Sequence, residues 1–176
     1  MHHRHFFWVI GLCAALGLPA GANDSALLLS GGLAAPMEEH PSIHMISAEI
    51  TVDLYNGHSR VQCDYLFRNE GPATTVTMGF PSLPGYGDIV EQQVAPELEQ
   101  FYTWVDGQEV GTRQVREART GETAGRRWYT KQVAFAAGQE RRVRDAYRQP
   151  NGRVAGGPQF LPYALSTGAS WHGPIG

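Results

Sequence analysis

The sequence predicts an all-β fold: an antiparallel β-sandwich of about eight short strands with little helix. Apolar and polar residues alternate in several short runs, and turn-forming residues separate these runs. The chain has 21 Gly and 11 Pro among 176 residues, which favours tight turns over long helices. A hydrophobic content of 42% suits one folded domain and excludes a chain that is disordered throughout.

The most regular alternation flanks an Asn-Gly dipeptide. The run Ile46–Tyr55 has apolar side chains at even positions, whereas Arg60–Asn69 has them at odd positions. Between them, Asn56-Gly57 tolerates the positive φ angles of a tight turn. The two runs therefore predict an antiparallel hairpin with one buried face and one solvent-facing side.

Shorter runs of the same kind predict the remaining strands. They are Thr75–Phe80, Phe101–Val105 with a return through Val110, Trp128–Ala137, Glu140–Arg148 and Phe160–Leu165. The polar stretch Arg113–Arg127 predicts a loop with one helical turn near Arg116–Thr120. A short helix within Asp88–Gln100 is compatible with the sequence, although Pro96 interrupts its pattern.

Residues 1–22 have the three-part plan of a secretory signal peptide. A His-rich start with Arg4 precedes the apolar run Phe6–Leu18, and small residues follow, so we expect cleavage after Ala22. The apolar run is shorter than the roughly 20 residues of a membrane span. The mature chain, residues 23–176, is thus predicted to be a single exported domain, periplasmic or extracellular, without a transmembrane segment.

Cleavage would leave Cys63 as the single cysteine of the mature chain. An exported domain with one cysteine has no internal disulfide framework. The alternation places Cys63 with Tyr65 and Phe67, which predicts a buried small hydrophobe.

Charge is unevenly distributed along the chain. The formal net charge is −3, and it divides into −10 over residues 1–110 and +7 over residues 111–176. Two interpretations are open. The arginines around Arg141 and Arg144 contact an anionic partner, or the charged side chains of the two halves pair with each other within one sandwich. The second interpretation is favoured. Pairing with these arginines is also expected for Asp145, which falls on an apolar strand face. The chain has no strong excess of basic residues, which a protein needs to bind the phosphate backbone of nucleic acid. Nucleic acid is therefore excluded as a partner.

The sequence contains no nucleophile elbow, phosphate-binding Gly loop or zinc signature. We therefore predict no catalytic, cofactor-binding or metal-ligating residue, and no cofactor. His40 and His44 are four residues apart, but Pro41 lies between them and the segment leads into a strand, which is unsuitable for a shared metal.

Aromatic and basic side chains are the candidate binding groups. Trp104, Trp128 and Trp171 would provide a stacking surface for sugars or peptides, although core packing uses the same residue types. Arg141 and Arg144 would contact an anionic ligand.

Two functions remain open on these grounds. The favoured one is a non-catalytic cell-envelope or extracellular binding or assembly module, with an envelope polymer or a protein as its partner. The alternative is an exported hydrolase or thiol-dependent enzyme that uses residues near Cys63 or the His40–His44 segment.

Several segments, in the right order, resemble the exported bacterial domain-of-unknown-function family 4424. They are Asn23-Asp24-Ser25, Gly31-Gly32-Leu33, the Ile43–Glu49 strand, Tyr65–Asn69, Gly79-Phe80-Pro81 and the closing Tyr163–Gly176 motif. The resemblance implies an exported domain without an established activity. Because the family continues into further strand after this motif, we expect the last strands of the sandwich to be missing here. A looser likeness to the von Willebrand-associated domain of inter-alpha-trypsin inhibitor heavy chains implies only a β-sandwich.

Overall fold

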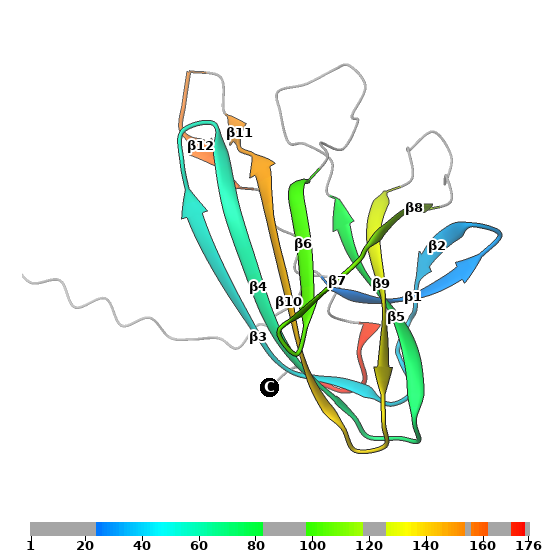
Figure 1. The fold of residues 1–176 in the computed structure, drawn as a ribbon. Helices are drawn as coiled ribbons and strands as arrows, with labels where there is room; N and C mark the ends of the chain where they lie inside the picture. The colour runs from blue at the N-terminus through cyan, green and yellow to red at the C-terminus, as the bar shows by residue number, and fades with distance from the viewer. Residues whose placement is uncertain (1–23, 83–97, 118–125, 154–155, 162–169, 175–176) are drawn as a thin grey trace, which may run out of the picture.

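The computed structural model describes residues 24–82, 98–117, 126–153, 156–161 and 170–174. These residues are mostly strand and contain no α-helix. Two mainly antiparallel sheets pack against each other and come together at one end of the molecule (Figure 1). The predicted all-β sandwich is therefore confirmed. Within the same residues, no helix is long and apolar enough to cross a membrane.

The first sheet curls until its outer strands meet. Its order is β1 (Ser25–Ser30), β2 (Leu33–Pro36), β8 (Arg113–Glu117), β9 (Arg127–Phe135) and β5 (Thr74–Ser82), and β5 pairs back to β1. Neighbouring strands are antiparallel except for β2 and β8, which are parallel. A small core of Leu27, Ala34 and Trp128 packs within this sheet.

The second sheet is open. Its order is β3 (Ile43–Leu54), β4 (His58–Asn69), β10 (Glu140–Pro150), β6 (Glu99–Val105) and β7 (Gln108–Val110). A separate ribbon consists of β11 (Gly152–Arg153) and β12 (Gln159–Phe160). The hairpin predicted at Asn56-Gly57 is present, and at Asp106-Gly107 both φ angles are positive, 50° and 81°, as a type I′ turn requires.

Two of the connections between the sheets, from β4 to β5 and from β9 to β10, lie at one end of the molecule. Buried Asn69 joins these two connections. Its backbone N–H donates to Gln139 O at 2.9 Å, and its side-chain Nδ2 donates to Pro72 O and Ala136 O at 2.7 and 3.0 Å. Because these bonds satisfy buried backbone groups, they fix the corner about which the sheets pack.

The main core lies between the sheets and consists of alternate residues from both. On β4 and β5 these are the predicted ones: Val61, Cys63, Tyr65, Phe67, Val76, Met78 and Phe80. Trp171, which lies outside the strands, fills the core beside Phe67 with the ring centroids 4.7 Å apart. The short segment that contains Trp171 lies between the two sheets, coloured red in Figure 1.

Three expectations about the strands need correction or fall outside the described residues. The prediction of a loop at Arg113–Arg127 is wrong at its start, because Arg113–Glu117 forms β8. The strand β8 contains a single apolar residue, Val115, so its sequence shows no alternation. The β1–β2 hairpin was not anticipated, since a run of three leucines does not alternate. Of the predicted strand Phe160–Leu165, Phe160 belongs to the two-residue β12, and residues 162–169 lie outside the described residues, as do 83–97 with most of the candidate helix.

The packing of β5 against β1 predicts a marked effect of one added methyl group. In Gly79→Ala, the new Cβ would lie 2.1 Å from Leu27 Cδ1 and 3.1 Å from Trp128 Cε3. We expect a loss of about 1–3 kcal/mol in the free energy of unfolding, measured by urea denaturation. Gly111→Ala is the control, because nothing lies within 4 Å of its Cβ; equal losses in both variants would contradict the packing.

Candidate functional site

The outward face of the second sheet carries polar and aromatic side chains in rows across its strands. One row runs Glu49, Asp64, Arg144, Trp104 and Glu109; the next runs Thr51, Gln62, Ala146 and Tyr102. The rows form because every second side chain of a strand points to the same face. The β3 residues join this face after a register shift between Met45 and Ser47.

A hollow of about 500 Å³, here called the tryptophan hollow, opens on the first row. Its lining includes Trp104, Asp64, Arg144, Gln62 and Glu49. Arg144 Nε donates to Asp64 Oδ1 at 2.6 Å, and Gln62 Nε2 donates to Asp64 Oδ2 at 2.8 Å. The carboxylate is therefore oriented by neighbours on two strands while its surroundings stay open to solvent.

A second hollow of about 290 Å³, the tyrosine hollow, lies over the next row and shares Gln62 with the first. Small Ala146 leaves space beside Tyr102, whose residue surface is 47% exposed. The rings of Tyr102 and Trp104 lie 6.1 Å apart at an interplanar angle of 35°. The two aromatic residues thus stand side by side along β6, with Trp104 lining the tryptophan hollow and Tyr102 lining the tyrosine hollow.

The structure brings together two of the five predicted binding residues. Trp104 and Arg144 are cross-strand neighbours in the tryptophan hollow. Arg141 is three residues from Arg144 and lies on the other side of β10, where its Nη1 donates to Asp106 Oδ2 at 2.9 Å. Trp128 and Trp171 are fully buried and present no ring face to solvent.

Tyr102 and Gln62 line the hollows but were not among the predicted binding residues. Tyr102 could have been found from the alternation, since it shares its parity with Trp104 on the same strand. Gln62 carries no such signal, because its place in the same cross-strand row as Tyr102, with Ala146 between them, depends on the strand order of the sheet.

The acidic and basic halves of the chain pair with each other, in agreement with the favoured interpretation of the charge asymmetry. The pairs are Arg144 with Asp64, Arg141 with Asp106 and Arg148 with Glu99; Arg68 and Glu140 also join the two halves, with the signs reversed. All lie on partly exposed side chains, so each contributes at most about 1 kcal/mol to stability.

Behind the hollows, between the sheets, lies a buried charge cluster of Asp24, Lys131 and Asp145. Lys131 Nζ donates to Asp145 Oδ1 and Oδ2 at 2.8 and 2.6 Å, and it lies 3.1 Å from Asp24 Oδ2. All three side chains are 0% exposed. Thr103 Oγ1 also donates to Asp145 Oδ1, which links β6 to β10. Lys131 is the one lysine of the sequence.

The expected partner of Asp145 was therefore wrong, although pairing itself was right. Its chain neighbour Arg144 points outward, because adjacent residues of a strand face opposite sides. Lys131 reaches Asp145 from β9 of the facing sheet. Only the packing of the two sheets brings these residues together.

Burial raises the pKa of Asp24 to about 7, because desolvation outweighs the attraction of Lys131; the charge of Asp145 raises it further. For Lys131, desolvation lowers the pKa, but attraction by Asp145 and Asp24 outweighs it and leaves the pKa raised. Lys131 Nζ, 3.1 Å from Asp24 Oδ2, and a hydrogen bond from the Ser25 backbone both lower the pKa of Asp24, but desolvation raises it by more. Ionised Asp24 thus gives the cluster one uncompensated negative charge.

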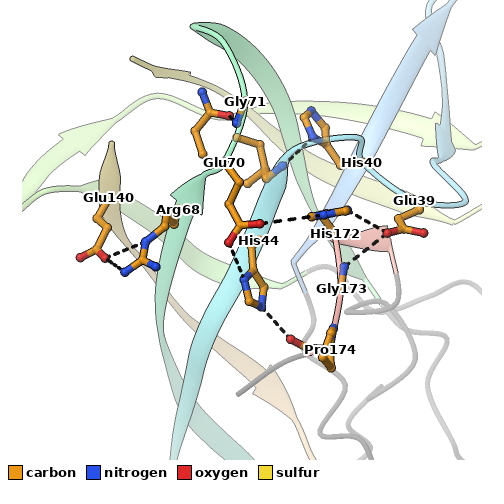
Figure 2. A network of polar contacts seen from close by, with 12 residues as sticks. Glu39, His40, His44, Arg68, Glu70, Gly71, Glu140, His172, Gly173 and Pro174 are labelled. Carbon is orange, nitrogen blue, oxygen red and sulfur yellow. Dashed lines mark hydrogen bonds and ion pairs between the residues drawn. The ribbon is translucent and has the colours of Figure 1, made fainter. Parts of the chain in front are cut away.

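A second, exposed network holds the segment 170–174 against β3, and Figure 2 shows it. His44 Nε2 lies 2.7 Å from Pro174 O, and its Nδ1 lies 3.3 Å from Glu70 Oε1. His172 Nδ1 lies 3.0 Å from Glu39 Oε1. These contacts attach the segment that carries Trp171 into the core.

His40 and His44 do not converge on a common point. His40 Nδ1 accepts hydrogen bonds from the backbone N–H groups of Ser42 and Ile43 at 3.2 and 3.0 Å. Burial lowers the pKa of His40, and the nearby His172 lowers it further. In the part of the chain that the structure describes, no three His, Cys, Asp or Glu residues are grouped to hold a metal ion.

These features define the protein as an all-β sandwich domain with an aromatic, polar hollow on one sheet. Residues 22–126, well over half of the chain, match the family model of a domain of unknown function, DUF4424, and the chain belongs to that family. No curated protein matches its sequence.

One solved structure shares the fold. It is the crystal structure of a putative nutrient binding protein from Legionella pneumophila, with a TM-score of 0.63 and 20% sequence identity. The similarity covers 78% of this chain and 48% of that one, so the present chain spans about half the length of its structural neighbour. At this identity, the similarity establishes the fold.

The buried cluster predicts a pH dependence of stability. Between pH 4 and 7, the folded state keeps a proton on Asp24 that the unfolded state, with its ordinary pKa of 3.8, has released. Stability therefore falls as pH rises through this window, and Asp24→Asn removes that fall.

The measurement is urea unfolding of the full chain and of Asp24→Asn at pH values from 4 to 8. The wild type should lose stability relative to the variant as pH rises. Asp53→Asn, on the exposed part of β3, is the control and should keep a constant difference from the wild type. A pH-independent difference for Asp24→Asn would disprove the raised pKa.

Proposed function

We propose that the protein is an exported, non-catalytic binding module that holds a neutral, sugar-like ligand on the outer face of its second sheet. The observation that carries the proposal is the aromatic pair Tyr102 and Trp104 beside the oriented polar groups of Asp64, Gln62 and Arg144. The description of the structural neighbour as a putative nutrient binding protein agrees with a binding role.

The chemistry of the two hollows suits a polyhydroxylated ring. Aromatic faces pack against the apolar C–H face of a sugar, while its hydroxyl groups need both donors and acceptors. Asp64 supplies acceptors, Arg144 supplies donors and Gln62 supplies both. Arg144 is the cross-strand neighbour of Trp104, and Asp64 and Gln62 lie one strand farther away on β4. A small number of fixed polar groups beside aromatic rings is typical of ligand sites.

The charge balance favours a neutral ligand over a polyanion. In the tryptophan hollow, Glu49 and Asp64 offset Arg142 and Arg144. Arg144 is already bonded to Asp64, so an anionic ligand would compete with an existing ion pair. A neutral envelope polysaccharide or a free oligosaccharide fits this surface better than a phosphate-rich polymer.

No specific observation favours the enzyme alternative. Cys63 is buried in the core, away from the outer face. His40 accepts bonds from its own turn, and His44 contacts Glu70 and Pro174. The residues named for that alternative therefore belong to structural contacts in the described part of the chain.

Removal of the tryptophan ring should abolish most of the binding. Neutral cello-, chito- and malto-oligosaccharides serve as probes in isothermal titration, with an unrelated neutral peptide and dextran sulfate as the other two arms. For whichever sugar binds, Trp104→Ala should weaken the affinity about 10- to 100-fold, because a packed aromatic face is lost. The melting temperature should change little, since Trp104 lies on the outer face.

Tyr55→Ala is the matched control, because Tyr55 is an exposed aromatic residue at the β3–β4 turn outside both hollows. Equal losses in Trp104→Ala and Tyr55→Ala would refute the site. Binding of dextran sulfate or peptide alone, without any sugar, would refute the ligand class.

Export is tested separately from binding. Expressed in a bacterium with its own leader, the chain should appear in the periplasmic or culture fraction with Asn23 as its first residue, as N-terminal sequencing would show. Retention of an uncleaved chain in the cytoplasmic fraction would contradict the proposed export.

A further inference from the structure

We infer that the free edge of β3, from Ser47 to Leu54, is a docking site for an extended peptide segment in which apolar side chains alternate with lysine or arginine. Such a segment would add a strand to the second sheet through backbone hydrogen bonds. Its apolar side chains would extend the core, and its basic side chains would meet acidic ones on the outer face. These contacts belong to a strand edge and do not depend on a sugar in the hollows.

The second sheet has one long open edge in the described part of the chain. The first sheet closes on itself, and β7, at one edge of the second sheet, is three residues long. In contrast, β3 has twelve residues and lies at the other edge, at the left of Figure 1. The unpaired N–H and C=O groups of a long edge are a template for another strand, and a short edge strand is one way to avoid such pairing.

Only the beginning of the β3 edge is covered. The backbone N–H of His172 donates to Ile43 O at 2.9 Å. From Ser47 onward, β3 pairs with β4 on one side, and no described strand lies on its other side. This part of the strand contains no proline and no lysine, and its register shift comes before Ser47. The usual devices that protect an edge from pairing are therefore missing from Ser47–Leu54.

The side of this edge that faces the first sheet is apolar and incompletely covered. Ile50 packs against the main core, whereas Val52 and Leu54, the next residues on the same face, are 38% and 66% exposed. Their cross-strand partners on β4, Val61 and Ser59, are buried. The core thus ends between β4 and β3. Apolar side chains of an added strand would lie beside Val52 and Leu54 and remove part of their surface from water.

The other side of the same edge is acidic. Glu49 and Asp53 lie on the outer face, and among the described residues neither forms an ion pair. The β4 partner of Glu49 is another carboxylate, Asp64. The partner of Asp53 is Arg60, whose guanidinium lies over the Tyr55 ring, 5.6 Å from its centroid. Basic side chains on an added strand would therefore face carboxylates, and opposite charges across two strands stabilise their pairing.

The same acidic side chains disfavour a second copy of this chain as the occupant. If two β3 strands paired antiparallel about Thr51, Glu49 of each copy would lie opposite Asp53 of the other. Like charges directly opposite each other destabilise a strand pair. A segment that alternates apolar and basic side chains avoids this repulsion and matches both faces of the edge.

Peptide binding and amide exchange together test this docking site. The probe is a peptide as long as the Ser47–Leu54 edge, in which lysine and valine alternate. Control peptides carry the same residues in two blocks, or glutamate in place of lysine. In isothermal titration with the full chain, the alternating peptide should bind more tightly than both controls. It should also slow hydrogen exchange at every second amide of Ser47–Leu54 by about tenfold or more, as followed by NMR, because these amides gain a partner.

Equal affinity for the block peptide would overturn the inference, because charge alone would then explain the binding. Binding that leaves the exchange rates of Ser47–Leu54 unchanged would overturn it as well, because the peptide would then lie elsewhere.

Two variants test the two sides of the edge. Val52→Lys places a charge on the apolar side and should weaken binding of the alternating peptide about tenfold or more. Asp53→Lys reverses a charge on the outer side and should weaken it about three- to tenfold. Asp53→Lys serves alone if Val52→Lys fails to fold.

Glu109→Lys is the matched control for Asp53→Lys. Glu109 is exposed on β7, at the opposite edge of the same sheet, and its replacement changes the net charge by the same amount. This variant should bind the peptide like the wild type. Equal weakening in Asp53→Lys and Glu109→Lys would overturn the inference, because the effect would then come from net charge.

Sedimentation of the full chain without peptide tests the competing occupant. We expect Val52→Lys and the wild type to sediment alike. A wild-type dimer that Val52→Lys dissociates would assign the edge to a second copy and overturn the choice of a basic, apolar peptide.

Discussion

The ion pair between Lys131 and Asp145 is the contact on which the relation of the two sheets depends. Lys131 belongs to β9 of the first sheet and Asp145 to β10 of the second, and both side chains are fully buried. Their desolvation is costly, so the pair adds little net stability, but breaking it leaves a bare charge in the core. Apolar contacts between two sheets tolerate small slips, whereas this pair allows one alignment. The corner at Asn69 sets the end of the sandwich, and the ion pair sets its middle.

The same pair organises the outer face of the second sheet. Asp145 is bound to Thr103 of β6 on the inner side, which fixes β10 and β6 to each other. Because strand residues alternate, fixing Asp145 and Thr103 inward fixes Arg144 and Trp104 outward in the adjacent row. The candidate site thus stands on two strands that are joined from behind by buried hydrogen bonds. Such support keeps a ligand site preorganised and lowers the entropy lost on binding.

The sequence predicts well those parts of the structure that depend on local alternation, as on β4, where Val61 and Phe67 are buried as expected. It fails for β8, which has a single apolar residue and exists because β2 and β9 supply hydrogen-bonding partners on both sides. It also leaves open whether an aromatic residue is in the core or on the surface: Trp128 is buried while Trp104 lines a hollow. Those outcomes depend on which strands become neighbours, and that information is non-local.

The buried cluster was beyond sequence reasoning for the same reason, although two signs of it are visible in the chain. One is a carboxylate, Asp145, on an otherwise apolar strand face, and the other is a lone lysine in a chain whose other cations are arginines. Arginine serves exposed pairs such as Arg144 with Asp64, where its planar group makes directed bonds at the surface. Lysine suits the core, because its compact ammonium group can bind two carboxylates from the end of an apolar stem. The use of lysine only at the centre of the sandwich therefore follows from the geometry of the cluster. The third member, Asp24, directly precedes β1 and so joins the start of the first sheet to that centre.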